Sequence, residues 1–231
     1  LNDSKTELGQ VGIIGAGNKL DTASNTVIMG MRNNVNVANK SSVAGFNQTA
    51  NAINFTSISG ADSTVNNTNY VYTTGINNTI KNADNVIALG NNMVVGSATT
   101  TAKNSILLGN NIAFASKDNM ANAVSIGDYS RANTGAVAVG VSAQALGEDS
   151  IAIGRDAIAT GSIATGSSAR AGNGGAAYGD DAVATYLNGE IPAGTVAGAA
   201  FQMHRDGIRT CARGIPGSLR KPHPARPAAV A

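Results

Sequence analysis

The residues that could support catalysis or tight metal binding are few and lie far apart. Both histidines, His204 and His223, and the single cysteine, Cys211, fall within residues 202–231. Because residues 1–201 hold neither residue type, serine–histidine and cysteine–histidine nucleophiles are excluded there, and this region needs neither disulfides nor structural zinc. A histidine in a Pro/Arg-rich tail is expected to be solvated rather than catalytic.

Paired carboxylates offer two further kinds of chemistry. Glu148-Asp149 and Asp180-Asp181 could serve a glycosidase, which uses two carboxylates. Gly174-Gly175 and Gly179-Asp180-Asp181 are the nearest fragments to the calcium-binding G-G-x-G-x-D nonapeptide. Their spacing departs from that motif, and acidic residues do not recur in every unit. We therefore interpret these carboxylates as solvated turn residues.

A glycine-rich segment, Gly12-Ile13-Ile14-Gly15-Ala16-Gly17, has the composition of a phosphate-binding loop. That fingerprint requires a following helix within a βαβ unit, and no helical periodicity follows it. Gly15 is instead in phase with a longer glycine series. We predict no catalytic residue, no metal ligand, no cofactor and no cofactor-binding residue, so the protein is expected not to be an enzyme. The sequence does not single out the ligand-binding residues.

The composition favours a thin, layered core over an ordinary globular one. Hydrophobic residues make up 42% of the 231 residues and are mostly Ala, Val and Ile, while aromatics are only 4%. No apolar run approaches the roughly 18 residues that a membrane-spanning helix needs. Residues 1–190 hold ten Lys/Arg and thirteen Asp/Glu, whereas the tail holds six Lys/Arg and one Asp. The body therefore offers no basic stripe for nucleic acid.

One short unit is repeated along most of the chain. Glycines that follow an apolar run recur at 15-residue spacings and then at spacings of 12 to 19, as Gly15, Gly30, Gly45, Gly60, Gly75, Gly90, Gly109, Gly127, Gly140, Gly154, Gly166 and Gly179. Twelve copies at so short a period are typical of a solenoid. We therefore predict an all-β, parallel β-solenoid of about twelve short turns.

Each unit has two arms around its glycine, which we number position zero. Positions +3 and +5 are mostly small or apolar, as in Ala143/Ala145 and Ala157/Ala159, whereas position +4 is polar in many copies, as in Arg131. This alternation predicts a strand with one wet face. The exposed +4 row and the turns are therefore the expected contact surface.

The arm before the glycine is apolar at three successive positions in many copies, as in 106–108 and 151–153. A strand that is apolar on both sides is expected to be buried on both. One side can pack inside the solenoid. The other, if exposed, would form a stripe larger than a soluble monomer usually shows. We therefore predict that copies of the chain associate through this stripe.

Three successive copies within residues 41–75 are less apolar. We expect Val43 and Ile58, at position −2, to form the second apolar face there. The positions that face the interior would then be small and polar, namely Ser42, Ser57, Ser59 and Thr74. This stretch is expected to depend most on contacts between chains.

Glycine and asparagine are expected to close the turns. Glycine reaches positive φ without steric cost, and asparagine tolerates the same region. Asparagine pairs are abundant in the first half, as Asn33-Asn34, Asn66-Asn67, Asn77-Asn78, Asn91-Asn92 and Asn110-Asn111. No proline precedes Pro192, as a continuous parallel ladder requires, because proline lacks the backbone N–H.

The later copies resemble a known family. The segment 149–159 (DSIAIGRDAIA) is similar to the S-x-A-x-G-x-x-A/S-x-A repeat of YadA-like heads of bacterial trimeric autotransporter adhesins, and so are 135–140 and 161–166. The similarity is strong from about residue 120 to 185 and weaker, but in phase, from 10 to 120. It implies a left-handed parallel β-roll in each chain and three chains packed around an axis.

The resemblance also implies a function and a domain plan. It implies a homotrimer on the surface of a Gram-negative bacterium that attaches to host cells, extracellular matrix proteins or other bacteria. Anchoring to the outer membrane would come only from a C-terminal domain that is missing here. We expect head repeats in residues 1–185, a degraded repeat or connector in 186–201, and a disordered, non-native tail in 202–231.

Other classes of β-solenoid remain open from the residues alone. A monomeric ice-binding solenoid would carry a flat, regular threonine array, and Thr99-Thr100-Thr101 does not form one. A carbohydrate-active solenoid would need clustered carboxylates and aromatics, which are sparse. A phage or surface fibre would share the same physics.

Overall fold

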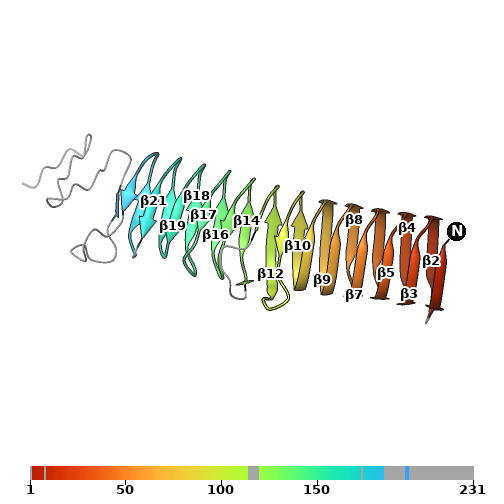
Figure 1. The fold of residues 1–231 in the computed structure, drawn as a ribbon. Helices are drawn as coiled ribbons and strands as arrows, with labels where there is room; N and C mark the ends of the chain where they lie inside the picture. The colour runs from red at the N-terminus through yellow and green to blue at the C-terminus, as the bar shows by residue number, and fades with distance from the viewer. Residues whose placement is uncertain (1, 8, 114–119, 173, 185–195, 198–231) are drawn as a thin grey trace, which may run out of the picture.

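In the computed structural model the chain is an elongated stack of coils, with the N-terminus at one end of the stack (Figure 1). The structure describes residues 2–7, 9–113, 120–172, 174–184 and 196–197. Every paired strand is parallel to its partner, and the described strands form one sheet of 19 strands and one of five. The molecule is an all-β parallel β-solenoid of about 11 turns, close to the twelve expected.

Most coils contribute two short strands. The strands that follow the repeat glycine are β1 (Asp3–Glu7), β3 (Lys19–Ser24), β5 (Asn34–Asn39), β7 (Thr49–Asn54), β11 (Val94–Val95), β13 (Met120–Ala121), β15 (Arg131–Ala132), β17 (Gln144–Ala145), β19 (Ile158–Thr160), β21 (Arg170–Gly172) and β23 (Val183–Ala184). The strands that precede or contain it are β2 (Val11–Ala16), β4 (Thr26–Met31), β6 (Ser42–Phe46), β8 (Ser57–Ala61), β12 (Ala102–Leu108), β14 (Val124–Ile126), β16 (Val137–Val139), β18 (Ile151–Ile153), β20 (Ile163–Thr165), β22 (Ala176–Tyr178) and β24 (Val196–Ala197). Two longer strands, β9 (Thr64–Ile76) and β10 (Thr79–Leu89), run through both arms.

The strand register confirms the repeat phase read from the glycines. Gly30 lies opposite Gly45, and Gly45 lies opposite Gly60. Where the spacing between repeat glycines becomes irregular, the offset between paired residues changes by the same amount. Leu108 pairs with Ile126, and Ile153 pairs with Thr165. The 19-residue unit that ends at Gly109 therefore leaves the ladder intact and has its extra residues within 96–101, between β11 and β12.

The interior of the solenoid is filled from both arms. Positions +3 and +5 are buried and +4 faces outward, as expected: Ala143 and Ala145 are buried, and Arg131 is exposed. Position −2 contributes the third inward row. In the N-terminal coils this row holds Ile28, and in the shorter C-terminal coils it holds Ala138 and Ala152. The smaller side chains allow the shorter coils to close around a thinner core.

The prediction for the three less apolar copies was wrong about which face is inside. Val43 and Ile58 are fully buried in the solenoid, whereas Ser42 and Ser59 are only partly buried and Thr74 is exposed. The reason is strand alternation: positions −4 and −2 point inward, so −3 and −1 must point outward. These copies therefore have an apolar interior, and the serines and threonine interrupt the outer face instead.

The corners use positive φ as predicted, although not at every expected residue. All twelve repeat glycines have positive φ, and so do Asn67, Asn77, Asn92 and Asn111. A Cβ on Gly60 would overlap the carbonyl oxygen of Gly75 in the next coil, so the glycines also permit close stacking. Asn33 does not itself have positive φ: it follows the corner residue Arg32, is fully buried, and donates from Nδ2 to the carbonyl of Met29 across the corner (3.3 Å).

Asn33 belongs to a polar ladder inside the solenoid. The backbone N–H of Asn33 donates to Oδ1 of Asn18 (3.1 Å), and that of Gln48 donates to Oδ1 of Asn33 (3.1 Å). Nδ2 of Asn33 donates to the carbonyl of Gly45 (3.1 Å), and Nδ2 of Asn78 donates to that of Gly90 (2.8 Å). Asn33 and Asn78 each accept from a backbone N–H of the next coil and donate to the carbonyl of that coil's repeat glycine, so both buried amides are satisfied.

Gln48 is the member of this ladder that fits least well. Its Oε1 accepts from the backbone of Ser63 (3.2 Å), but its buried Nε2 has no partner. We expect Gln48→Asn to raise the free energy of unfolding by about 1 kcal/mol, because an unsatisfied buried donor is destabilising. Urea unfolding followed by circular dichroism measures this. The reverse exchange, Asn33→Gln, should be destabilising, and equal effects of both variants would contradict the explanation.

The C-terminal limit of the repeat region remains a prediction. Val196 and Ala197 in β24 pair with Ala176 and Ala177, so the ladder reaches residue 197. The rest of the expected connector and the tail at 202–231, with His204, Cys211 and His223, lies outside the described residues.

Candidate adhesive surface

The +4 row lies on the outer surface of the strands that follow the glycine. Its exposed members differ in charge and polarity from one coil to the next: Lys19, Asn34, Thr49, Val94, Arg131 and Arg170. The row does point to solvent as predicted. Its side chains do not converge, so it offers a shallow, repeated surface rather than a pocket.

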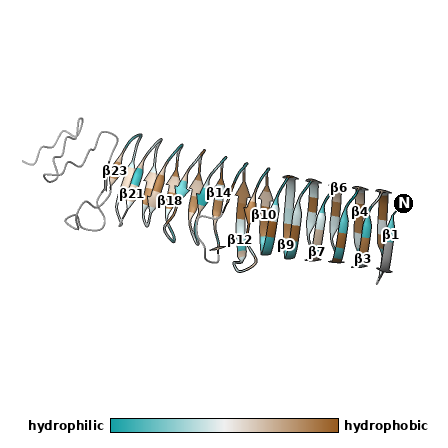
Figure 2. Ribbon diagram, viewed as in Figure 1, coloured by the Kyte–Doolittle hydropathy of each residue, from teal (hydrophilic) through white to brown (hydrophobic). Residues whose placement is uncertain are grey.

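An apolar row runs along the outer surface of the strands that precede the glycine. It is made by positions −3 and −1, which the register stacks coil upon coil: Val27, Met29, Ile87, Leu89, Ile106, Leu108, Val124, Ile126, Val137, Val139, Ile151, Ile153 and Ile163. Five of these side chains are exposed, with Ile153 at 40% and Ile106 at 39%, and the others are half-buried. Figure 2 shows apolar residues recurring along the stacked strands. Soluble monomers rarely expose a continuous apolar surface of this kind.

The row is interrupted in the coils where Ser42, Ser57 and Ser59 face outward. In the same coils exposed aromatic residues lie at the corners. Phe55 and Tyr70 stack with their ring centroids 4.7 Å apart, and Nζ of Lys40 lies 4.8 Å from the centroid of Phe55. At the opposite corner, Arg32 lies over the ring of Phe46 at 5.7 Å. In these coils the exposed aromatic side chains therefore lie at the two corners that flank the strands.

In the N-terminal coils, ladders of asparagine side chains lie on the strands that follow the repeat glycine. One ladder runs Asn39–Asn54–Asn69–Asp84, in which each Nδ2 donates to the next side-chain oxygen at 2.8, 2.8 and 3.0 Å. A second runs Asn36–Asn51–Asn66 at 2.8 and 3.2 Å. The asparagine abundance in the sequence is the signal from which both could have been found.

An inserted segment, residues 96–101, is joined to the preceding coil by Asn82, whose Nδ2 donates to the carbonyl of Ser97 (2.6 Å). Within the segment, the hydroxyl group of Ser97 contacts those of Thr99 and Thr100 at 3.3 and 2.9 Å. An open groove of about 470 Å³ lies over the first ladder and is bordered by Thr101 of this segment. Sequence reasoning did not find the groove, because it depends on which coils the insertion faces.

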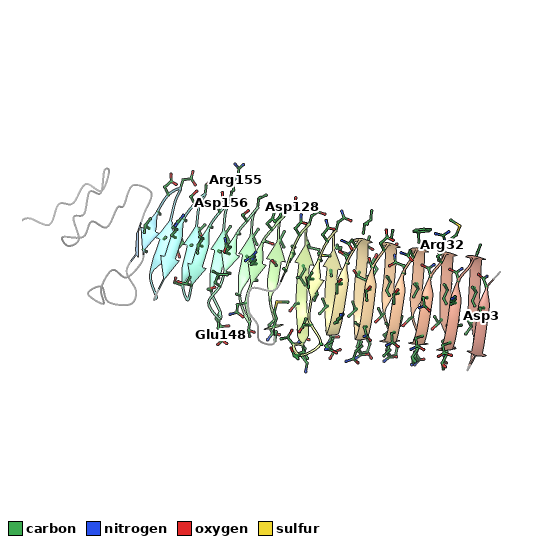
Figure 3. The ribbon with its side chains drawn as sticks, in the orientation of Figure 1. Asp3, Arg32, Asp128, Glu148, Arg155 and Asp156 are labelled. Carbon is green, nitrogen blue, oxygen red and sulfur yellow. The ribbon has the colours of Figure 1, made fainter. Side chains whose placement is uncertain are left out.

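The paired carboxylates, Glu148-Asp149 and Asp180-Asp181, lie in turns between strands. Glu148 lies at one corner of the coils, whereas Arg155 and Asp156 lie at the opposite corner (Figure 3). Asp180 accepts a hydrogen bond from the backbone of Ser167 (2.8 Å), as a turn residue does. Within the described part of the chain, no three His, Cys, Asp or Glu side chains are grouped so that they could hold a metal ion.

The glycine-rich segment 12–17 is part of the ladder. Gly12 to Gly15 lie in β2, and Gly15 is stacked on Gly30 of the next coil. The described residues contain no helix that is long and apolar enough to cross a membrane.

Comparison with known proteins gives one match. The family model described as YadA head domain repeat (2 copies) matches residues 132–157, from the end of β15 through β18. No curated protein and no solved structure matches the chain significantly. The matched residues form two successive coils whose inward side chains are alanines apart from Ser150, and whose outward −3 and −1 positions are Val or Ile. Residues 132–157 of this solenoid thus match two copies of the YadA head domain repeat.

Proposed function

We propose that this protein is the head of a trimeric autotransporter adhesin, displayed on the surface of a Gram-negative bacterium. Members of the matched repeat family are structural and adhesive rather than catalytic, and they are exposed at the bacterial surface. The proposal extends this role from the matched residues 132–157 to the whole solenoid, because the same coil geometry continues in register on both sides.

The observation that carries the proposal is the apolar row at positions −3 and −1. If each chain is a left-handed roll, three chains would pack with their apolar rows facing a common axis. Burial of apolar surface contributes about 25 cal/mol per Å² before the entropy cost of association is subtracted, and the row is continuous from β10 to β18. The +4 row and the corners would then face outward on all three chains.

Such a head would bind large partners through many weak contacts repeated along its coils and on its three chains. The partners proposed are host cells, extracellular matrix proteins or other bacteria. Three copies of a shallow surface give avidity without any single deep pocket, provided that the partner presents repeated sites.

Light scattering after size exclusion on the full chain tests the proposal. The expected mass is three times the monomer mass of 23.1 kDa, independent of concentration over the micromolar range. Beads coated with the trimer should then attach to matrix-coated surfaces or to cells. A folded chain that stays monomeric, and whose strands before the glycine gain no protection from hydrogen exchange when a fused C-terminal trimeric coiled coil holds three copies together, would overturn the proposal.

A further inference from the structure

We propose that the groove beside residues 96–101 binds an extended, uncharged oligosaccharide. This inference names a partner class for the adhesin head and so rests on the function proposed above. The groove has a volume of about 470 Å³, within the range of about 300–1,000 Å³ that is usual for ligand sites. Its polar lining comes from successive coils: Asn54, Asn69 and Asp84 on one row, Asn67 and Asn82 on another, and Lys103 at the end.

The carboxamides in the groove match the chemistry of sugar hydroxyl groups. Each carboxamide offers two N–H donors and two acceptor sites. Within the ladder, Nδ2 of Asn69 donates one hydrogen bond to Asp84, and Oδ1 of Asn69 accepts one from Asn54. The second N–H and the second acceptor site of this carboxamide remain for a ligand. A sugar hydroxyl both donates and accepts, so a row of such amides can hold a row of hydroxyls.

The spacing and charge of the groove narrow the ligand further. Stacked coils repeat at about 4.8 Å, which is close to the length of one ring in an extended β-1,4-linked sugar chain. Asp84 and Lys103 occupy paired positions on neighbouring strands and contribute opposite charges. The lining therefore has no net charge and favours a neutral chain. The stacked pair Phe55 and Tyr70, each next in sequence to a ladder asparagine, supplies apolar surface nearby.

An extended peptide fits this groove poorly. Peptides commonly gain affinity by adding a strand to a free sheet edge. Here Asn69 pairs in register with both Asn54 and Asp84, so the strands under the groove have no free edge. Apolar anchor pockets are also missing from the polar lining, whose apolar members are Ala52 and Ala83.

Isothermal titration of the full chain with cellohexaose and chitohexaose tests the inference. We expect at least one of them to bind, and Asn54→Ala/Asn69→Ala to weaken it at least tenfold. The matched control is Asn51→Ala/Asn66→Ala, which breaks the neighbouring ladder in the same coils without touching the groove. It should change the affinity less than twofold.

The outcomes separate this inference from the adhesin proposal. If neither sugar binds at millimolar concentration, or if both double variants weaken binding equally, the inference is overturned. If the groove variant instead loses binding to gelatin, the groove holds an extended peptide and the inference also fails. Trimer mass and attachment of coated beads, measured on the same samples, report on the adhesin proposal independently.

Discussion

Gly60→Ala is expected to break the stack of coils near the middle of its N-terminal half. Gly60 has φ of 125°, and a Cβ there would overlap the carbonyl oxygen of Gly75 on the next coil. That oxygen belongs to the backbone ladder and cannot move without separating β8 from β9. We expect a loss of more than about 4 kcal/mol, at the extreme of what single substitutions do.

Gly161→Ala is the matched control for that variant. Gly161 has almost the same φ, 124°, but a Cβ there would meet nothing within 4 Å. Its cost should therefore be backbone strain alone, about 1–3 kcal/mol. Hydrogen exchange measures the local opening of each variant at its own site, in the amides of β8 and β9 for Gly60→Ala and of β19 and β20 for Gly161→Ala, because each coil of a solenoid contacts only its neighbours. Equal protection losses in the two variants would show that strain, not stacking, fixes the glycine.

Ile153→Glu is expected to convert the proposed trimer to monomers. Ile153 is 40% exposed in the single chain, so a carboxylate there should leave the coil folded. Around a trimer axis three such carboxylates would be buried together without partners, at a cost of several kcal/mol each. Light scattering should therefore report one third of the wild-type mass, with an unchanged circular dichroism spectrum.

Val94→Glu provides the comparison for Ile153→Glu. Val94 is similarly exposed, at 47%, but belongs to the +4 row on the strands that follow the glycine. This variant should keep the wild-type mass. If both variants stay trimeric, the apolar row is not the subunit interface. If Val94→Glu alone dissociates, the chains associate through the +4 row instead.

The strand register shows how much the repeat pattern predicts. Between Gly15 and Gly179 the glycine series predicted the register of the paired strands, including the irregular pairing of Leu108 with Ile126, because a parallel ladder copies the repeat length directly. The same reading could not assign the two sides of the strands that precede the glycine. An apolar run such as 106–108 fits either orientation, and the serines in 42–59 were therefore placed on the wrong side.

By itself, the sequence determined the class of fold, the phase of the coils and the need for glycine at their corners. These properties are local and periodic, so they repeat in every unit and reinforce one another. Only the tertiary structure decided that position −2 faces the interior, that Asn33 lies in a buried ladder and that residues 96–101 border a groove. An apolar run fits either side of a strand, so its inward side is fixed only when the strand packs. The buried ladder and the groove depend on side chains that meet between neighbouring coils.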